Sequence, residues 1–258
     1  MTIGRLLSVR NLVIGSALLF LVAFVLFPLA LLVLRSFLGA DGEVSLENYI
    51  AVYSMERNWD AVVMTLWVCG LTMFFSMIFA TGLAWLVVRS NLPYRRLFRS
   101  LFFIPYVIPP YVGAIAWILL LTPGVGYVNK MLVELFGAEM PGPFDIYTVP
   151  GLVWVMTLFY YPLAFLNVAS ALEQMDNTLE EAARISGASP LRVFRDITLP
   201  LVSPGFFAGG LLVFAASASA FGVPAMIGMP SRIYVLSTQV IQYVYMGTTS
   251  GMREATAL

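Results

Sequence analysis

The longest uncharged stretch of the sequence, residues 197–231, reads ITLPLVSPGFFAGGLLVFAASASAFGVPAMIGMPS and holds 35 residues without a charged side chain. A helix needs about 20 apolar residues to cross the hydrocarbon core of a bilayer. Four further uncharged runs precede it, at 11–34, 61–88, 100–129 and 146–172. The sequence therefore predicts an all-α, polytopic bundle of transmembrane helices in a lipid bilayer. The expected spans lie at about 12–34, 61–88, 101–121, 150–172 and 203–223.

The composition excludes several classes of protein. Apolar residues make up 60% of the chain and charged residues 11%, whereas soluble domains have about 45–50% and 25%. The absence of histidine excludes His-based acid–base catalysis and most zinc hydrolase sites. The single cysteine, Cys69, excludes an intrachain disulfide, and a net charge of zero gives no reason to expect nucleic acid binding. We therefore expect one membrane domain over 1–258 that is not an enzyme and has no catalytic residue, metal site or bound cofactor.

Two segments depart from a simple series of straight spans. Residues 233–252 are uncharged but rich in hydroxyl and amide side chains, so we expect a reentrant or interfacial segment there, with a sixth span as the alternative. The third run contains Pro105, Pro109 and Pro110, and a proline kinks or breaks a helix because it lacks a backbone donor. The resulting bend either serves packing alone or shapes a pathway, and the sequence leaves both interpretations open.

Basic residues predict the orientation, because cytoplasmic loops carry an excess of arginine and lysine. Nine basic residues fall on one side of the predicted spans and five on the other. The nine are Arg5, Arg10, Arg89, Arg95, Arg96, Arg99, Arg184, Arg192 and Arg195. We therefore expect a multi-pass membrane protein, with the N-terminus and the segment between the fourth and fifth spans in the cytoplasm.

The predicted spans contain no aspartate, glutamate, lysine or arginine. Ion-driven transporters normally keep such residues at membrane depth, so a transporter with this sequence is expected to take its energy from a partner. Asn167, Ser217 and Ser219 are candidates for lining a pathway. Interhelical hydrogen bonding is the alternative role for these polar residues.

Residues 176–204, DNTLEEAARISGASPLRVFRDITLPLVSP, carry strong local signals between the fourth and fifth spans. Thr178 and Glu181 have the spacing of the N-cap and N3 residues of a capping box. Gly187 is placed to end that helix in the left-handed conformation. The helix is too short to be stable alone, so it needs something to dock against.

A second short helix is expected directly afterwards. Ser189 offers an N-cap and Pro190 suits the first helical position. Pro200 and Pro204 are expected to bend this unit into the fifth span. Together the signals predict a helix–turn–helix exposed on a membrane protein.

The spacing in this segment resembles the EAA loop of ABC-importer permeases: Glu181-Ala182-Ala183, three residues, Gly187, nine residues, then Ile197-Thr198-Leu199-Pro200. In that family the loop forms a coupling helix, which seats in a groove of the cytoplasmic ATPase. The resemblance therefore implies that loop 173–200 couples this chain to an ATPase dimer, and that ATP binds to that partner. The residues that it assigns to coupling are Glu181, Ala182, Ala183, Gly187, Ile197, Leu199 and Pro200.

The resemblance also implies the bacterial inner membrane as the location, further partners and a substrate. A second permease half or a homodimer partner completes such a permease, and a periplasmic binding protein delivers the substrate. Residues 89–120 are similar in texture to the ferric-iron and thiamine permeases, so ferric iron is the expected substrate, with thiamine and polyamine next. Permeases of this kind commonly carry two homologous halves in one chain, each with its own EAA loop. This sequence has one such loop, so we expect the first half of a longer permease or a truncated copy. A secondary carrier and a non-transporting membrane scaffold are the alternative functions.

Overall fold

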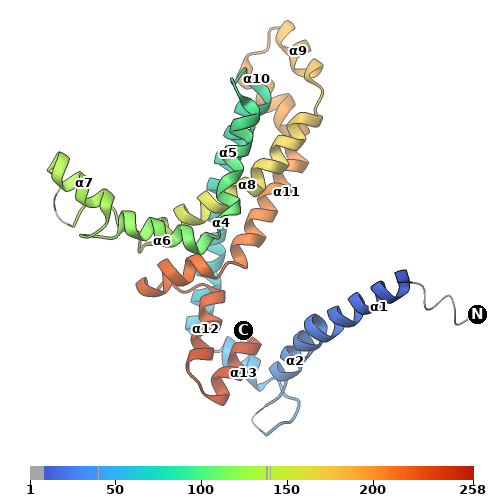
Figure 1. Ribbon diagram of the computed structural model, residues 1–258, viewed down its shortest axis with the longest axis vertical. Coiled ribbons are helices and arrows are strands. Elements are labelled where there is room, and N and C mark those ends of the chain that lie inside the picture. Colours follow the sequence, from blue (N-terminus) through green and yellow to red (C-terminus); the bar gives the residue numbers. More distant parts are fainter. Residues whose placement is uncertain (1–8, 40, 138, 140) are drawn as a thin grey trace, which may run out of the picture. The chain divides into compact units, whose positions relative to one another are not determined.

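The computed structural model describes residues 9–39, 41–137, 139 and 141–258, and the regular structure within those ranges is helical apart from one isolated β-bridge (Figure 1). The chain divides into two compact units. One comprises the residues up to Trp59 together with Gln239–Leu258, and the other comprises Asp60–Thr238. Arg5, which contributes to the predicted charge bias, lies outside the described residues.

Four continuous helical segments are long and apolar enough to cross a membrane: Arg10–Ser36, Glu56–Arg89, Val149–Gln174 and Pro190–Ala218. Three of them overlap the spans predicted at 12–34, 61–88 and 150–172. The first segment joins α1 (Val9–Leu21), the π-helical turn η2 (Val22–Leu26) and α2 (Phe27–Ser36). The second is α4 (Glu56–Arg89) and the third is α8 (Val149–Gln174). The last joins α10 (Pro190–Val193), the π-helical turn η3 (Phe194–Thr198) and α11 (Leu199–Ala218).

The run predicted to kink or break at its prolines, 101–121, is broken. The structure has two helices, α5 (Arg95–Val107) and α6 (Pro110–Leu121), which are bent by 92° relative to each other. The break lies at Ile108 and Pro109, whose backbones are extended, because consecutive prolines remove two successive backbone donors. Pro105 lies inside α5 and does not end it.

The fifth span begins earlier and ends earlier than predicted. Its helix runs from Pro190 to Ala218, so it starts before the predicted residue 203 and ends before the predicted residue 223. Pro200 lies in the first turn of α11, and Pro204 lies inside that helix. Hydropathy places the start too late because the first turns of the helix carry arginine and aspartate.

The remaining helices are short. Residues 233–252 form no single helix long enough to span a membrane, as is expected of a reentrant or interfacial segment. The short elements are α3 (Glu47–Tyr53), α7 (Tyr127–Phe136), α9 (Asn177–Ile185), the π-helical turn η4 (Pro224–Gly228), the 3-10 turn η5 (Met229–Ser231), α12 (Leu236–Tyr245) and α13 (Thr249–Ala257).

Helix α8 forms the centre of the 60–238 unit and packs closely against α11. A Cβ atom built on Gly205 would lie 2.5 Å from the Cβ of Ala171, and one built on Gly209 would lie 3.0 Å from the Cα of Ala164. The two backbones therefore approach closely through small residues, as is typical of helices in membranes. The crossing sets the positions of both ends of the 176–204 segment, because α8 leads into it and α11 leads out of it.

In the other unit, buried asparagines join segments that are distant in sequence. Asn48 donates hydrogen bonds to the carbonyl groups of Ser36 and Leu38, at 3.0 and 2.9 Å, and so fixes the end of α2 against α3. Asn58 and Tyr243 are hydrogen-bonded at 2.8 Å, which ties the start of α4 to α12.

Candidate functional site

The segment between α8 and α11 forms one end of the 60–238 unit, where α9 and α10 lie beyond the bundle of longer helices (Figure 1). Helix α9 begins differently from the prediction. Its N-cap is Asp176, whose Oδ1 accepts the backbone N–H of Thr178 at 2.9 Å. The predicted capping box of Thr178 and Glu181 is therefore wrong, because an aspartate two residues earlier supplies the cap. This hydrogen bond lowers the pKa of Asp176 below its usual value.

The end of α9 confirms the prediction for Gly187. Its φ is +83°, in the left-handed region. The N–H of Gly187 donates to the carbonyl of Arg184, and the N–H of Ala188 donates to that of Ala183, both at 3.0 Å. This is the Schellman arrangement, in which a left-handed glycine reverses the chain after a helix.

The next helix starts as predicted. Ser189 is the N-cap and accepts the N–H of Arg192 at 3.4 Å, and Pro190 occupies the first turn. The two short helices are therefore joined by a turn whose geometry their own sequence specifies.

The outer face of α9 is exposed to solvent. Ile185 is 88% exposed, and Leu191, just after the turn, is 76% exposed. Glu181 lies one helical turn before Ile185 and is also exposed. Among the described residues no hydrogen bond or ion pair involves the side chain of Glu181. Ala182 is exposed and Ala183 is half-buried.

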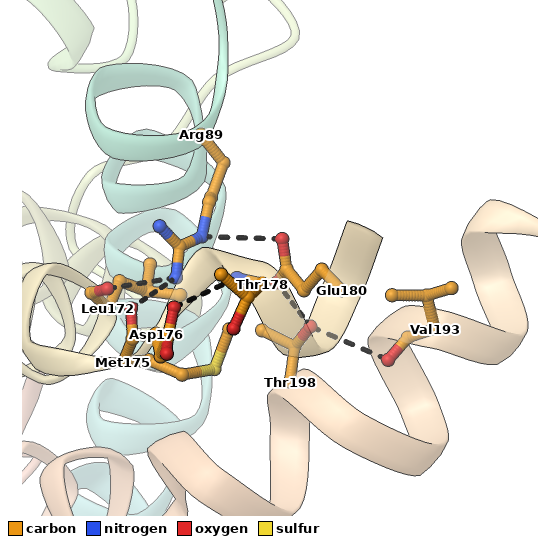
Figure 2. Close-up of polar contacts among 8 residues, drawn as sticks. All are labelled: Arg89, Leu172, Met175, Asp176, Thr178, Glu180, Val193 and Thr198. Atoms are coloured by element: carbon orange, nitrogen blue, oxygen red, sulfur yellow. Dashed lines mark hydrogen bonds and ion pairs between the residues drawn. The ribbon is translucent and has the colours of Figure 1, made fainter. Parts of the chain in front are cut away.

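The inner face of α9 carries Glu180, which the sequence analysis missed. Figure 2 shows its carboxylate between Arg89 and Thr198. The Nε of Arg89 lies 3.6 Å from Oε2, and the hydroxyl of Thr198 donates to Oε1 at 2.6 Å. The side chains of Arg89 and Glu180 are only 8% and 6% exposed. Two adjacent glutamates look alike in a sequence, and only the packing of α9 shows which one is buried.

Arg89, the last residue of α4, also holds the end of α8. Its Nη2 donates to the carbonyl groups of Leu172 and Met175, at 2.9 and 3.4 Å (Figure 2). These carbonyl groups have no partner within their own helix, and a cation there interacts favourably with the negative end of the helix dipole. We call Arg89, Glu180 and Thr198 the Arg89 cluster.

The last residues of the EAA-like pattern lie on the helix that leaves this site. Ile197 is half-buried, whereas Leu199 and Pro200 are exposed. Thr198, between them, is buried and belongs to the Arg89 cluster. The structure thus places the predicted coupling residues on α9, in the turn that follows it, in η3 and at the start of α11.

The three predicted pathway residues do not lie together. Asn167 lines a cavity of about 540 Å³ between α8 and α11, with Ser170, Gln174 and Asp176 among its other lining residues. The hydroxyls of Ser217 and Ser219 donate to the carbonyls of Phe214 and Ala216 in their own helix. Ser217 also interacts with the side chain of Cys69 in α4, which is an interhelical contact of the kind given above as the alternative role.

Residues 73–252 match the family of the binding-protein-dependent transport system inner membrane component. The chain belongs to this family. The molybdenum transport system permease protein ModB of Escherichia coli K12 is 37% identical over 168 residues, which cover 65% of this chain and 70% of that protein. The putative 2-aminoethylphosphonate transport system permease protein PhnU of Salmonella choleraesuis is 28% identical over 223 residues, covering 84% and 78%.

Two further likenesses agree with this assignment. The sulfate transport system permease protein CysT of Salmonella typhimurium is 29% identical over 226 residues, covering 86% of this chain and 76% of that protein. A crystal structure of a bacterial ABC transporter involved in the import of the acidic polysaccharide alginate contains a chain of the same fold. Its TM-score is 0.78 at 18% identity, over 98% of this chain and 90% of that one.

The family establishes the class of protein. This chain is an ABC-importer permease of the inner membrane, with several membrane-spanning helices, and its relatives are transport proteins and not enzymes. Such a permease works with an ATPase and a substrate-binding protein. The three relatives are named for molybdenum, 2-aminoethylphosphonate and sulfate, so they give no support to the expected ferric iron, thiamine or polyamine.

Proposed function

We propose that this chain forms half of the translocation pathway of an ATP-driven importer and is coupled to a cytoplasmic ATPase dimer through loop 173–200. One observation carries the proposal. Helix α9 is firmly capped, its inner face is buried, and its outer face presents Glu181 and Ile185 to solvent. An isolated helix of this length is unstable in water, so a fixed helix with an exposed apolar side chain suits a partner that covers it.

The substrate that we propose is a small oxyanion such as molybdate, sulfate or a phosphonate. The names of the three relatives support this class. The predicted spans also carry no aspartate or glutamate, so a pathway between them would contain no carboxylate at membrane depth to repel an anion. Hydroxyl and amide groups would supply neutral donors. Ferric iron, which was expected from the texture of residues 89–120, lacks comparable support.

A second permease half would complete the pathway, either as another copy of this chain or as a related chain, and a periplasmic protein would deliver the oxyanion. The arginine bias of the sequence orients the α9–α10 end toward the cytoplasm, since Arg89, Arg99 and Arg184 all belong to that end. Rocking of the two halves against each other would then expose the pathway to each side in turn.

The coupling role is tested with the chain and its ATPase co-expressed in membranes. We expect Glu181→Ala and Gly187→Val to reach the membrane in normal amounts and to lose most of the co-purified ATPase. At Gly187 a Cβ atom would meet nothing within 4 Å, so valine acts only through the positive φ. Gly187→Asn is the matched control, because asparagine tolerates that conformation. Glu134→Gln controls for the loss of an exposed negative charge elsewhere.

Substrate class is tested by uptake into proteoliposomes that contain the chain, its ATPase and its binding protein. Molybdate, sulfate and 2-aminoethylphosphonate are compared with ferric iron, thiamine and putrescine. Uptake of ferric iron and of none of the oxyanions would reject the oxyanion proposal. Uptake that follows a proton gradient at constant ATP would indicate a secondary carrier. Normal ATPase recovery with normal uptake in both loop variants would reject the coupling role.

A further inference from the structure

The Arg89 cluster joins four segments that meet at the α9–α10 end. Arg89 closes α4, its guanidinium binds the last carbonyl groups of α8, Glu180 belongs to α9, and Thr198 lies in η3 at the start of the α11 span. The hydroxyl of Thr198 also lies 3.4 Å from the carbonyl of Val193, within the helical segment that leads to α11. One carboxylate is therefore the common partner of groups on the first and last of these segments (Figure 2).

The burial of the Glu180 carboxylate favours one position of α9. A buried charge is unfavourable unless it is paired and hydrogen-bonded, and Glu180 has both an ion pair and a hydroxyl donor. Rotation of α9 away from the bundle would leave Glu180 and Arg89 buried without each other or would expose both. The bound position of α9 is thus strongly favoured over alternatives that differ by a small rotation.

We propose that the Arg89 cluster is a positioning device for coupling: it fixes α9 to the ends of α4, α8 and the α11 span, so that displacement of the outer face of α9 moves the membrane helices with it. The inference rests on the proposed function. It assigns Glu180, Arg89 and Thr198 to the transmission of movement, whereas Glu181 and Ile185 are assigned to docking. Loss of the cluster should leave the docking face intact and separate ATP hydrolysis from transport.

Two variants remove different parts of the cluster. Glu180→Gln keeps an oxygen acceptor for Thr198 and removes the charge opposite Arg89. Thr198→Val removes the hydroxyl with little change in shape and leaves the ion pair in place, so it tests the idea even where the first variant folds poorly. Thr198→Ser restores the hydroxyl and is the conservative rescue. Arg99→Gln is the matched control, since it breaks the exposed ion pair with Glu173 near the same end.

The first readout is amide hydrogen exchange of residues 177–185 in the purified full-length chain. We expect faster exchange in Glu180→Gln and Thr198→Val, and wild-type exchange in Thr198→Ser and Arg99→Gln. The second readout is the number of oxyanions imported per ATP hydrolysed. It is measured with molybdate, sulfate or 2-aminoethylphosphonate, whichever the wild-type complex imports. We expect this ratio to fall about fivefold or more in the two cluster variants, which is the lower end of typical coupling between sites, with normal recovery of the ATPase.

The outcomes separate this inference from the proposed function. Wild-type exchange in α9, or a wild-type import ratio, in both Glu180→Gln and Thr198→Val would overturn it. Loss of the ATPase in proportion to uptake would also overturn it, because the cluster would then serve docking alone. Failure of the wild-type chain itself to bind an ATPase would instead refute the proposed function, and the exchange data would still decide whether the cluster fixes α9.

Discussion

The close crossing of α8 and α11 gives a prediction at Gly205. In Gly205→Ala the added methyl group would lie 2.5 Å from the Cβ of Ala171 and 3.0 Å from the backbone oxygen of Asn167. Carbon atoms pack best at about 3.5–4.0 Å, so the helices would have to separate locally by about 1 Å. Over-packing costs about 1–3 kcal/mol, and alanine regains about 0.5–1 kcal/mol of helix stability over glycine. We expect a net loss of about 1 kcal/mol.

The same helix provides a matched control. A Cβ atom on Gly210 would lie 3.6 Å from the Sδ of Met77 and 3.7 Å from the side chain of Met73, which are ordinary contacts with flexible side chains. Gly210→Ala is therefore expected to be neutral or to stabilise the protein by up to about 1 kcal/mol. The difference between the two variants isolates the effect of the crossing from the effect of helix propensity.

The assay is thermal unfolding of the full-length chain in one detergent, where about 1 kcal/mol shifts the midpoint by roughly 2–4 °C for a chain of this size. Adding Ala171→Gly to Gly205→Ala moves the methyl group to the other helix and should restore much of the loss. The contact with Asn167 remains, so recovery is expected to be partial. The reasoning is refuted if Gly205→Ala is as stable as Gly210→Ala, or if the double variant shows no favourable coupling between the two sites.

Three further predictions concern other parts of the chain. The ionised cap at Asp176 should stabilise α9 at pH values above the usual pKa of an aspartate, and this stabilisation should be lost as the pH falls through its lowered pKa. Amide exchange of α9 is compared with that of Asp176→Asn at each pH, because asparagine caps a helix without titrating. The predicted orientation puts position 95 in the cytoplasm and position 145 on the opposite side of the membrane. Of cysteines introduced at these two positions, only the one at 145 should react with an impermeant reagent added outside the cell. Asn129→Asp should lower the unfolding midpoint, because the buried amide donates to the carbonyls of Thr122 and Phe144 and an unmet hydrogen bond costs about 1–3 kcal/mol.

Local chemistry was sufficient to predict part of the candidate site. Gly187 and Ser189 have their predicted roles because a left-handed turn and an N-cap depend on a few neighbouring residues. The same reasoning could have predicted the cap at Asp176. Thr178 and Glu181 matched the capping-box pattern, however, so the predicted helix start was two residues too late. Long uncharged runs likewise predicted where the long helices lie.

The errors concern features that depend on tertiary structure or on residues outside the bilayer. Hydropathy cannot find the start of the last spanning helix at Pro190, because its first turns carry charged residues in contact with water. Prolines predict a kink or a break in the helix near position 109, but the 92° angle between the two helices depends on what they pack against. The burial of Glu180 follows from the position of Arg89, which is 91 residues away along the chain.

The adjacent glutamates of α9 explain why one short helix can serve two purposes. Successive residues on a helix point about 100° apart, so Glu180 and Glu181 cannot face the same surroundings. The first meets Arg89 and Thr198 inside the protein, and the second meets solvent. Under the proposed coupling, a partner that contacts Glu181 and Ile185 would not compete for Glu180. The movement that it imposes would then reach α4, α8 and α11 through that buried carboxylate.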